Sequence, residues 1–221
     1  MKPTRKQFNN IICFIVFILG LIYILNFVTP YLYRWLPNDY IRTHLIIETL
    51  ADTAQTPDVV IFGNSRGMSG INGYMLEEKM KGNPTVYSLT STGQQVSESA
   101  LYYTSLPSSV KVVLQCVDID QLSKPIDMDT PNRVALHMYG YEMDALTEKI
   151  VPSLSEKLDI SPFYYNYEAR NCLFTGLSIL LRNLLDDDVI QDATAKELRY
   201  PTSKTSDRND ITYQRDVDEQ N

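Results

Sequence analysis

The longest hydrophobic pattern in the chain is an uninterrupted apolar run near the N-terminus, over residues 11–28. A helix of this length, rising about 1.5 Å per residue, crosses roughly the 30 Å of a hydrocarbon core. Lys2, Arg5 and Lys6 precede the run, and Pro30 closes it before a group of aromatic residues typical of a membrane interface. A cleaved signal peptide would have a shorter core followed by small residues. The pattern therefore predicts a single-pass anchor in the cell membrane, with the N-terminus in the cytoplasm.

A short helix and a linker are expected between the anchor and the folded domain. Asp39 is placed to cap a helix over residues 40–50 next to the membrane, and residues 51–57 are polar enough to form a linker. We expect the folded domain to begin at residue 58, outside the cytoplasm.

Three apolar runs of strand length form the first part of this domain. They cover residues 59–62, 85–89 and 110–117. Helical segments are expected between them, over residues 73–80 and, with Ser97 as its cap, over residues 98–105. Runs without polar alternation indicate strands covered on both faces, and the β-α-β-α-β order predicts parallel pairing with right-handed crossovers. The fold class is therefore α/β, an open parallel sheet of flavodoxin-like type, incomplete in strand number, behind one transmembrane helix.

The pattern changes after residue 122. A proline-punctuated loop is followed by helices expected over residues 133–150 and 164–185. Glu168, Arg170 and Arg182 leave the second helix too short an apolar run to cross a bilayer, so a core or lid helix is expected. The polar end is expected to be a disordered tail or the start of a helix that is cut short.

These patterns divide the chain into a cytoplasmic N-terminus, a transmembrane helix, a juxtamembrane helix with linker, an α/β core, a helical insert or lid, and a polar tail or truncated helix start. Their ranges are 1–10, 11–28, 29–57, 58–122, 123–198 and 199–221.

Composition and charge narrow the function classes. With 44% hydrophobic and 21% charged residues, the chain is typical of a globular protein. A formal net charge of −7 and the lack of a basic stripe argue against nucleic acid as a partner. Cys13, Cys116 and Cys172 lack metal-ligand spacing and are interpreted as small buried hydrophobes, with a disulfide between the last two left open. Neither a metal nor a cofactor is expected.

A serine in a glycine-bracketed turn is the strongest candidate for chemistry. Gly63, Asn64 and Ser65 come directly after the first strand, and ligands in open α/β sheets bind at the carboxyl ends of strands. The backbone N–H groups of Ser65 and of Gly93, which follows the second strand, would open toward the same crevice and stabilise an oxyanion. Asp118 follows the third strand. A helix cap and a phosphate-binding turn are the alternatives for Ser65.

The Gly63-Asn64-Ser65 turn, Gly93 and Asp118 resemble the first three sequence blocks of the SGNH (GDSL-like) hydrolase superfamily. The anchor and the helical insert resemble its membrane-tethered, cell-envelope members, which handle acyl groups on glycans. The resemblance covers roughly residues 58–122 and implies a three-layer α/β/α fold with Ser65 as the nucleophile and Gly93 as a second oxyanion donor. It also implies the lipid bilayer, an envelope polysaccharide and a membrane-bound acyltransferase as partners.

Two of the flanking residues complete the expected site. Asn64 and Arg66 stand on either side of the serine as substrate-binding candidates. Arg66 would orient an anionic glycan or form an ion pair with Glu77 or Glu78.

The chain departs from the superfamily pattern in two ways. Asp118 stands where the superfamily commonly has an asparagine donor, and an ionised carboxylate can only accept hydrogen bonds. The superfamily's base is a histidine in a D-x-x-H segment, but neither His44 nor His137, the only histidines, has an aspartate three residues earlier. Three interpretations follow: the N-terminal part of a longer hydrolase, a non-catalytic tethered glycan-binding or scaffold protein, or a hydrolase that recruits His137. We expect little or no activity.

Overall fold

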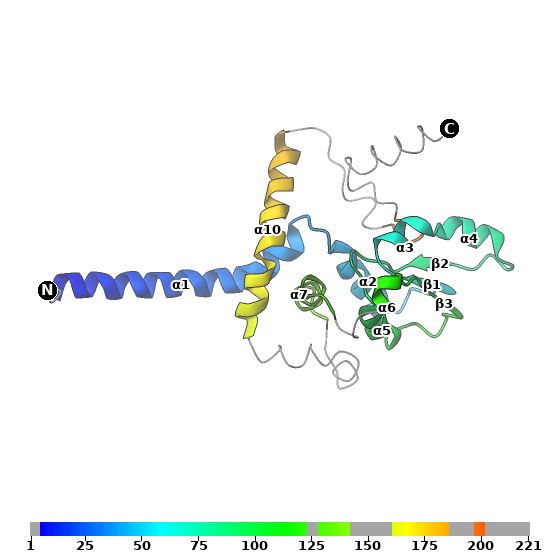
Figure 1. Ribbon diagram of the computed structural model, residues 1–221, viewed down its shortest axis with the longest axis horizontal. Helices are drawn as coiled ribbons and strands as arrows, with labels where there is room; N and C mark the ends of the chain where they lie inside the picture. Colours follow the sequence, from blue (N-terminus) through cyan, green and yellow to red (C-terminus); the bar gives the residue numbers. More distant parts are fainter. Residues whose placement is uncertain (1–4, 123–127, 142–160, 186–196, 202–221) are drawn as a thin grey trace.

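The computed structural model describes residues 5–122, 128–141, 161–185 and 197–201 (Figure 1). Helix α1 (Arg5–Trp35) projects away from the rest of the molecule. Within the described part of the chain, α1 is the one helix long and apolar enough to cross a membrane, with a mean hydropathy of 2.9 in a window that is 0% buried. The predicted apolar helix is therefore present.

The end of the apolar helix differs from the prediction, because α1 continues through Pro30 to Trp35. Proline lacks the N–H group that would donate to the carbonyl four residues earlier. That carbonyl belongs to Asn26, and it accepts a hydrogen bond of 2.9 Å from Nδ2 of Asn166 in helix α10 (Ser161–Leu185). A neighbouring helix thus satisfies the acceptor that the proline leaves open, and the helix does not end.

A small parallel sheet of three strands lies at the other end of the molecule. The strands are β1 (Val59–Phe62), β2 (Val86–Ser88) and β3 (Val112–Gln115). Their order is β2-β1-β3, and Val59 of β1 is in register with Val86 and Val112. The predicted parallel pairing is confirmed, although β2 and β3 are shorter than the apolar runs that predict them.

Short helices follow the first two strands. They are α3 (Ser65–Gly70), α4 (Gly73–Lys79) and α5 (Val96–Tyr103). The sequence predicts α4 but not α3, which is rich in glycine and serine. Helix α5 begins two residues before the predicted start, with Gln95 as its N-cap, and Ser97 is buried inside the helix instead of capping it.

The central strand β1 is buried along its whole length. Its alternating side chains enter the hydrophobic core on the two faces of the sheet. On one face, helix α2 (Ile41–Ala51) contributes Ile46 beside Phe62, and on the other face α4 contributes Leu76 beside Ile61. Helical residues therefore pack against both faces of the central strand, which explains its continuous apolar sequence.

Helix α2 is bonded into the sheet through the buried side chain of Arg42. The guanidinium donates to the carbonyls of Ser88 and Thr90, each at 2.7 Å, at the exit of β2. Tyr40 occupies the N-cap position instead of the predicted Asp39, and the side chain of Asn38 accepts the hydrogen bond from its N–H. The segment that follows α1 is thus part of the folded core.

The C-terminal half of the described chain packs where α1 enters the domain. Helix α6 (Ile119–Leu122) follows β3, and α7 (Thr130–Met138) ends just before Gly140, whose φ is +75°. A second cluster joins α1, α7 and α10 through residues such as Tyr33, Tyr139 and Tyr165. The helix predicted over residues 133–150 is described only as far as α7, because residues 142–160 lie outside the described residues.

Residues 197–201 lie beside β2. The N–H of Ser88 donates to the carbonyl of Leu198 at 2.5 Å, and the N–H of Gly73 donates to the carbonyl of Arg199 at 3.0 Å. The rest of the predicted polar tail, residues 202–221, lies outside the described residues. Cys13, Cys116 and Cys172 are all free thiols.

The turn after β1 packs closely against Cys116. A Cβ atom added at Gly63 would lie 2.6 Å from Cβ of Cys116, and one added at Gly67 would lie 2.9 Å from the same atom. Gly63 also has a φ of +148°, a conformation that other residues rarely adopt. Glycine at both positions lets the start of α3 approach the end of β3.

We expect Gly67→Ala to destabilise the domain by about 1–3 kcal/mol, because the new methyl group would overlap with Cys116. Gly70→Ala is the matched control, since no atom lies within 4 Å of a Cβ at that end of the same helix. Thermal denaturation of the detergent-solubilised variants, followed by circular dichroism, measures the difference. Equal melting temperatures for the two variants would show that the glycine contact is not tight.

Candidate functional site

Ser65 is the first residue of α3 and lies directly beyond the buried strand β1. Its side chain is exposed. Asn64 is the N-cap of this helix, and its side-chain oxygen accepts a hydrogen bond of 3.0 Å from the N–H of Arg66. The short helix therefore begins on an asparagine cap, and the cap presents the serine at the carboxyl end of the central strand.

Asp118 is held by the two residues that flank the serine. Its carboxylate accepts a hydrogen bond from Nδ2 of Asn64 and lies 3.2 Å from Nη1 of Arg66. The structure thus brings Asn64, Arg66 and Asp118 together around Ser65. The ion-pair partner of Arg66 is thus Asp118 and not Glu77. Glu77 instead accepts a hydrogen bond of 3.0 Å from Nε of Arg199.

The loop that carries Gly93 is attached to the turn that carries the serine. The N–H of Gly63 donates to the side-chain oxygen of Gln94 at 2.5 Å, and the N–H of Ser91 donates to the carbonyl of Gly63 at 3.1 Å. Gly93 is exposed and has a φ of +64°, which favours glycine. The exits of β1 and β2 are thereby fixed relative to each other, and the backbone at Gly93 is open to solvent.

The buried carboxyl group of Glu98 is connected to this loop through Asn132. Glu98 of α5 is fully buried and accepts hydrogen bonds from the Tyr102 hydroxyl at 2.8 Å and from Nδ2 of Asn132 at 2.7 Å. The same amide group of Asn132 donates to the carbonyl of Thr92 at 3.2 Å. Sequence reasoning missed this network, although a glutamate one turn before a tyrosine inside an apolar helix is a signal for a buried polar group.

Burial raises the pKa of Glu98 to about 7, because a charged carboxylate is poorly solvated in the core. Hydrogen bonds from Tyr102, Asn132 and Ser91 act in the opposite direction and lower it. The group therefore titrates near neutral pH, at the base of the loop that positions Gly93.

Both histidines pack against aromatic rings in the second cluster. The ring of His137 stacks on Tyr165 with centroids 4.1 Å apart, and burial lowers its pKa. The ring of His44 stacks on Tyr139 at 4.7 Å, with Nε2 3.2 Å from Glu48. No described side chain forms a hydrogen bond with Oγ of the candidate nucleophile. The structure therefore brings neither histidine to the serine.

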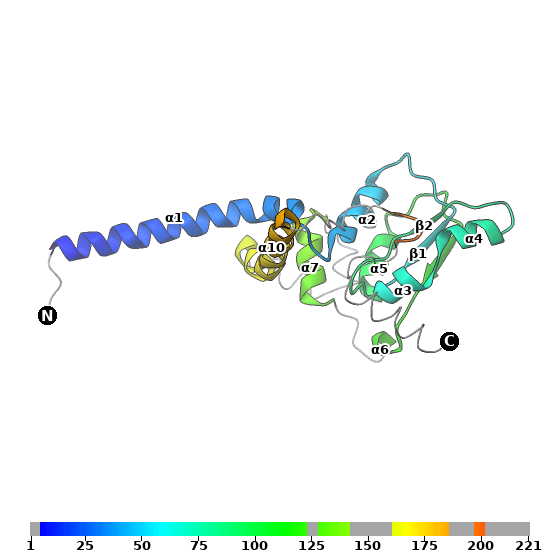
Figure 2. The same cartoon turned by 90° about the horizontal axis from the view of Figure 1, so that it is seen from above.

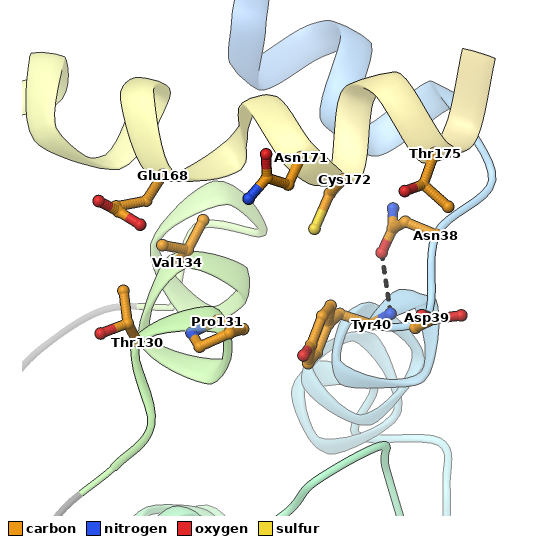
Figure 3. Close-up of a pocket in the computed structure, with 10 residues that line it drawn as sticks. All are labelled: Asn38, Asp39, Tyr40, Thr130, Pro131, Val134, Glu168, Asn171, Cys172 and Thr175. Carbon is orange, nitrogen blue, oxygen red and sulfur yellow. Dashed lines mark hydrogen bonds between the residues drawn. The ribbon is translucent and has the colours of Figure 1, made fainter. Parts of the chain in front are cut away.

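A pocket of about 350 Å³ lies apart from the serine, between α10, α7 and the loop after α1 (Figure 3). The thiol of Cys172 points from α10 into this space, and burial raises its pKa. Asp39 and Glu168 are among the residues that line it. Within the part of the chain that the structure describes, no group of three or more potential metal ligands is present.

No protein-family model, curated protein or solved structure matches this chain. The interpretation of the site therefore depends on its residues and their geometry.

The elevated pKa of Glu98 predicts a specific pH dependence of stability. Between the ordinary pKa of 4.5 and the folded value of about 7, the folded state keeps a proton that the unfolded state has lost. The free energy of unfolding therefore falls as pH rises through this window, by up to about 3 kcal/mol. We expect Glu98→Gln to remove this pH dependence. As the pH is raised from 5 to 8, the difference in free energy of unfolding between the variant and wild type should therefore shift in favour of the variant.

Guanidinium unfolding of the detergent-solubilised protein at both pH values measures this effect. Glu78→Gln, at an exposed position on α4, is the matched control and should keep the wild-type slope. A wild-type slope for Glu98→Gln would show that Glu98 does not titrate in this range.

Proposed function

We propose that this chain is a membrane-anchored, extracytoplasmic SGNH-like protein, related to the ester hydrolases and O-acyltransferases that act on cell-envelope glycans. The observation that carries the proposal is the exposed Ser65 at the start of α3, directly beyond the central parallel strand. In such a protein the domain would have the full three-layer α/β/α arrangement. Helical packing on both faces of β1 supports this arrangement.

The proposed membrane anchor is α1. Its apolar window is exposed along its length, as a segment surrounded by lipid would be, and large hydrophobic side chains such as Phe14 and Phe17 face outward. The positive residues before the apolar run favour a cytoplasmic N-terminus, which places the α/β domain on the opposite side.

The proposed chemistry is attack of Ser65 Oγ on an ester carbonyl. The developing oxyanion would be stabilised by backbone N–H groups at Ser65 and Gly93, whose turns are joined by the Gly63–Gln94 hydrogen bond. Arg66 offsets the charge of Asp118 beside the reacting group. This arrangement supplies a nucleophile and oxyanion donors.

Among the described residues the proposed site has no histidine base, since both histidines are stacked on tyrosine rings elsewhere. Loss of one member of a catalytic triad lowers kcat by several orders of magnitude. We therefore propose little turnover by this chain alone. The carboxylate of Asp118 at the site favours, as the second candidate, a tethered glycan-binding or scaffold protein without catalysis.

An external base separates these two functions. We expect a fluorophosphonate probe to label the solubilised chain weakly, and imidazole to raise Ser65 labelling on the order of tenfold or more, because imidazole replaces the missing base. Ser65→Ala should abolish the increase. Ser69→Ala, also on α3 and exposed, should retain it. Imidazole without effect on Ser65 would favour the scaffold function, and equal labelling of Ser65→Ala would exclude Ser65 as the nucleophile.

Replacing the carboxylate at the site tests its electrostatic role. We expect Asp118→Asn to raise imidazole-dependent labelling of Ser65 by roughly tenfold, because a neutral amide can donate to the oxyanion where a carboxylate cannot. Asp120→Asn, at an exposed position two residues further along, should leave the rate unchanged. A decrease for Asp118→Asn would mean that the carboxylate is needed to hold Asn64 and Arg66 in place.

A further inference from the structure

Helix α10 carries an apolar stripe on its exposed surface. The stripe consists of Tyr167, Phe174, Leu177, Leu181 and Leu184. Successive members are seven, three, four and three residues apart, a spacing that places them on one side of a helix with 3.6 residues per turn. Their exposed fractions range from 45% at Leu177 to 74% at Leu184, so the described part of the chain leaves most of the stripe uncovered.

The stripe is distinct from the side of α10 that packs inside the domain. Tyr165 and Ala169 are buried in the second cluster, and a Cβ atom at Gly176 would lie 2.5 Å from the carbonyl of Pro37. A third side is polar and includes Asn171 and Thr175, both exposed. Helix α10 therefore has a core side, a polar side and an apolar side without a protein partner among the described residues.

The position of α10 relative to α1 indicates what the apolar side faces. Helix α10 runs crosswise to α1 in Figure 1, and Figure 2 shows it nearly end-on while α1 keeps its full length. The two helices cross where Asn166 bonds to Asn26 and Gly176 meets Pro37. Asn26 belongs to the last turn of the predicted span, so the crossing lies at the level where the span would leave the hydrocarbon core.

Exposed aromatic side chains continue the apolar surface along α1 at the same level. Phe27, Tyr31 and Trp35 are exposed, Trp35 by 82%. Such residues are typical of the boundary between acyl chains and headgroups. Near the crossing, α1 and α10 thus both expose large apolar side chains.

A basic residue on the same side of the helix has the geometry expected at a headgroup layer. Arg170 stands between Tyr167 and Phe174, and its guanidinium lies 3.6 Å from the centroid of the Tyr167 ring. Folded back in this way, the side chain covers part of the Tyr167 ring, and its charged end donates to the Tyr167 carbonyl at 2.6 Å at the N-terminal end of the stripe. This arrangement fits a helix at an interface better than one immersed in hydrocarbon.

We propose that α10 lies in the lipid–water interface, with its apolar stripe in contact with bilayer lipids and its polar side turned to solvent. This inference rests on the proposed anchoring of the chain by α1. A spanning helix and a helix in the membrane plane together hold the domain at two places. The bilayer is the occupant because the helix that carries the stripe crosses α1 at the end of the predicted span, where α1 also exposes large apolar side chains.

Tryptophan quenching in bilayers tests this placement with the full chain. Trp35 is the only tryptophan, so a Trp35→Phe background allows a single reporter at Leu181→Trp on the stripe or at Thr175→Trp on the polar side. Both proteins are reconstituted in phosphatidylcholine vesicles with or without brominated acyl chains. We expect Leu181→Trp to lose roughly half its fluorescence in brominated lipid, because an interfacial helix buries its apolar side about 5–10 Å into the headgroup–acyl boundary. Thr175→Trp should lose little.

Flotation of the same vesicles distinguishes failure of the anchor from failure of the inference. Protein that floats while Leu181→Trp is unquenched would overturn the placement of α10 and leave the anchor intact. Protein that does not float would overturn the anchoring and, with it, this inference. Equal quenching at both positions would mean that α10 is immersed, and an unquenched reporter in a protein that cross-links as a dimer would assign the stripe to a second copy.

Discussion

The buried guanidinium of Arg42 is the interaction on which the arrangement of the domain depends. Besides its two bonds to the exit of β2, Nη1 donates to the carbonyl of Glu197 at 2.9 Å. A buried cation is unfavourable unless polar partners replace its water, and burial lowers the pKa of Arg42 to about 10. The side chain stays protonated at neutral pH. The guanidinium of Arg42 therefore links helix α2, the exit of β2 and residues 197–201.

The sequence predicts those parts of the fold that depend on simple periodicity. The run at residues 59–62 coincides with β1, since a strand buried on both faces must be apolar throughout. Helix α3 could not be predicted, because its glycines and serines have weak helix propensity and it forms through the Asn64 cap and the contact with Cys116. The sequence also does not predict that Arg42 is buried, because a basic residue in an amphipathic segment is expected at the surface.

For the candidate site, parallel strand order alone predicts that Ser65, Gly93 and Asp118 follow neighbouring strands. It does not predict that Asn64 and Arg66 both bind the carboxylate, because that depends on the direction in which α3 leaves the sheet. The sequence also does not predict the partners of Glu98. They come from α5, from α7 and from the loop between β2 and α5, and only the tertiary fold brings these polar groups together.

The uninterrupted passage of α1 through Pro30 has a mechanical consequence. Tyr33 and Leu36, at the end of that passage, are buried in the domain, and Arg34 donates to the carbonyl of Met138 at 2.8 Å. A domain on a flexible tether sweeps a volume whose radius grows with tether length. Among the described residues, α1 enters the domain without a break, so in the proposed anchored protein Ser65 would stand at one height and orientation relative to the bilayer. A glycan polymer, the proposed partner, would then have to reach the serine at that height.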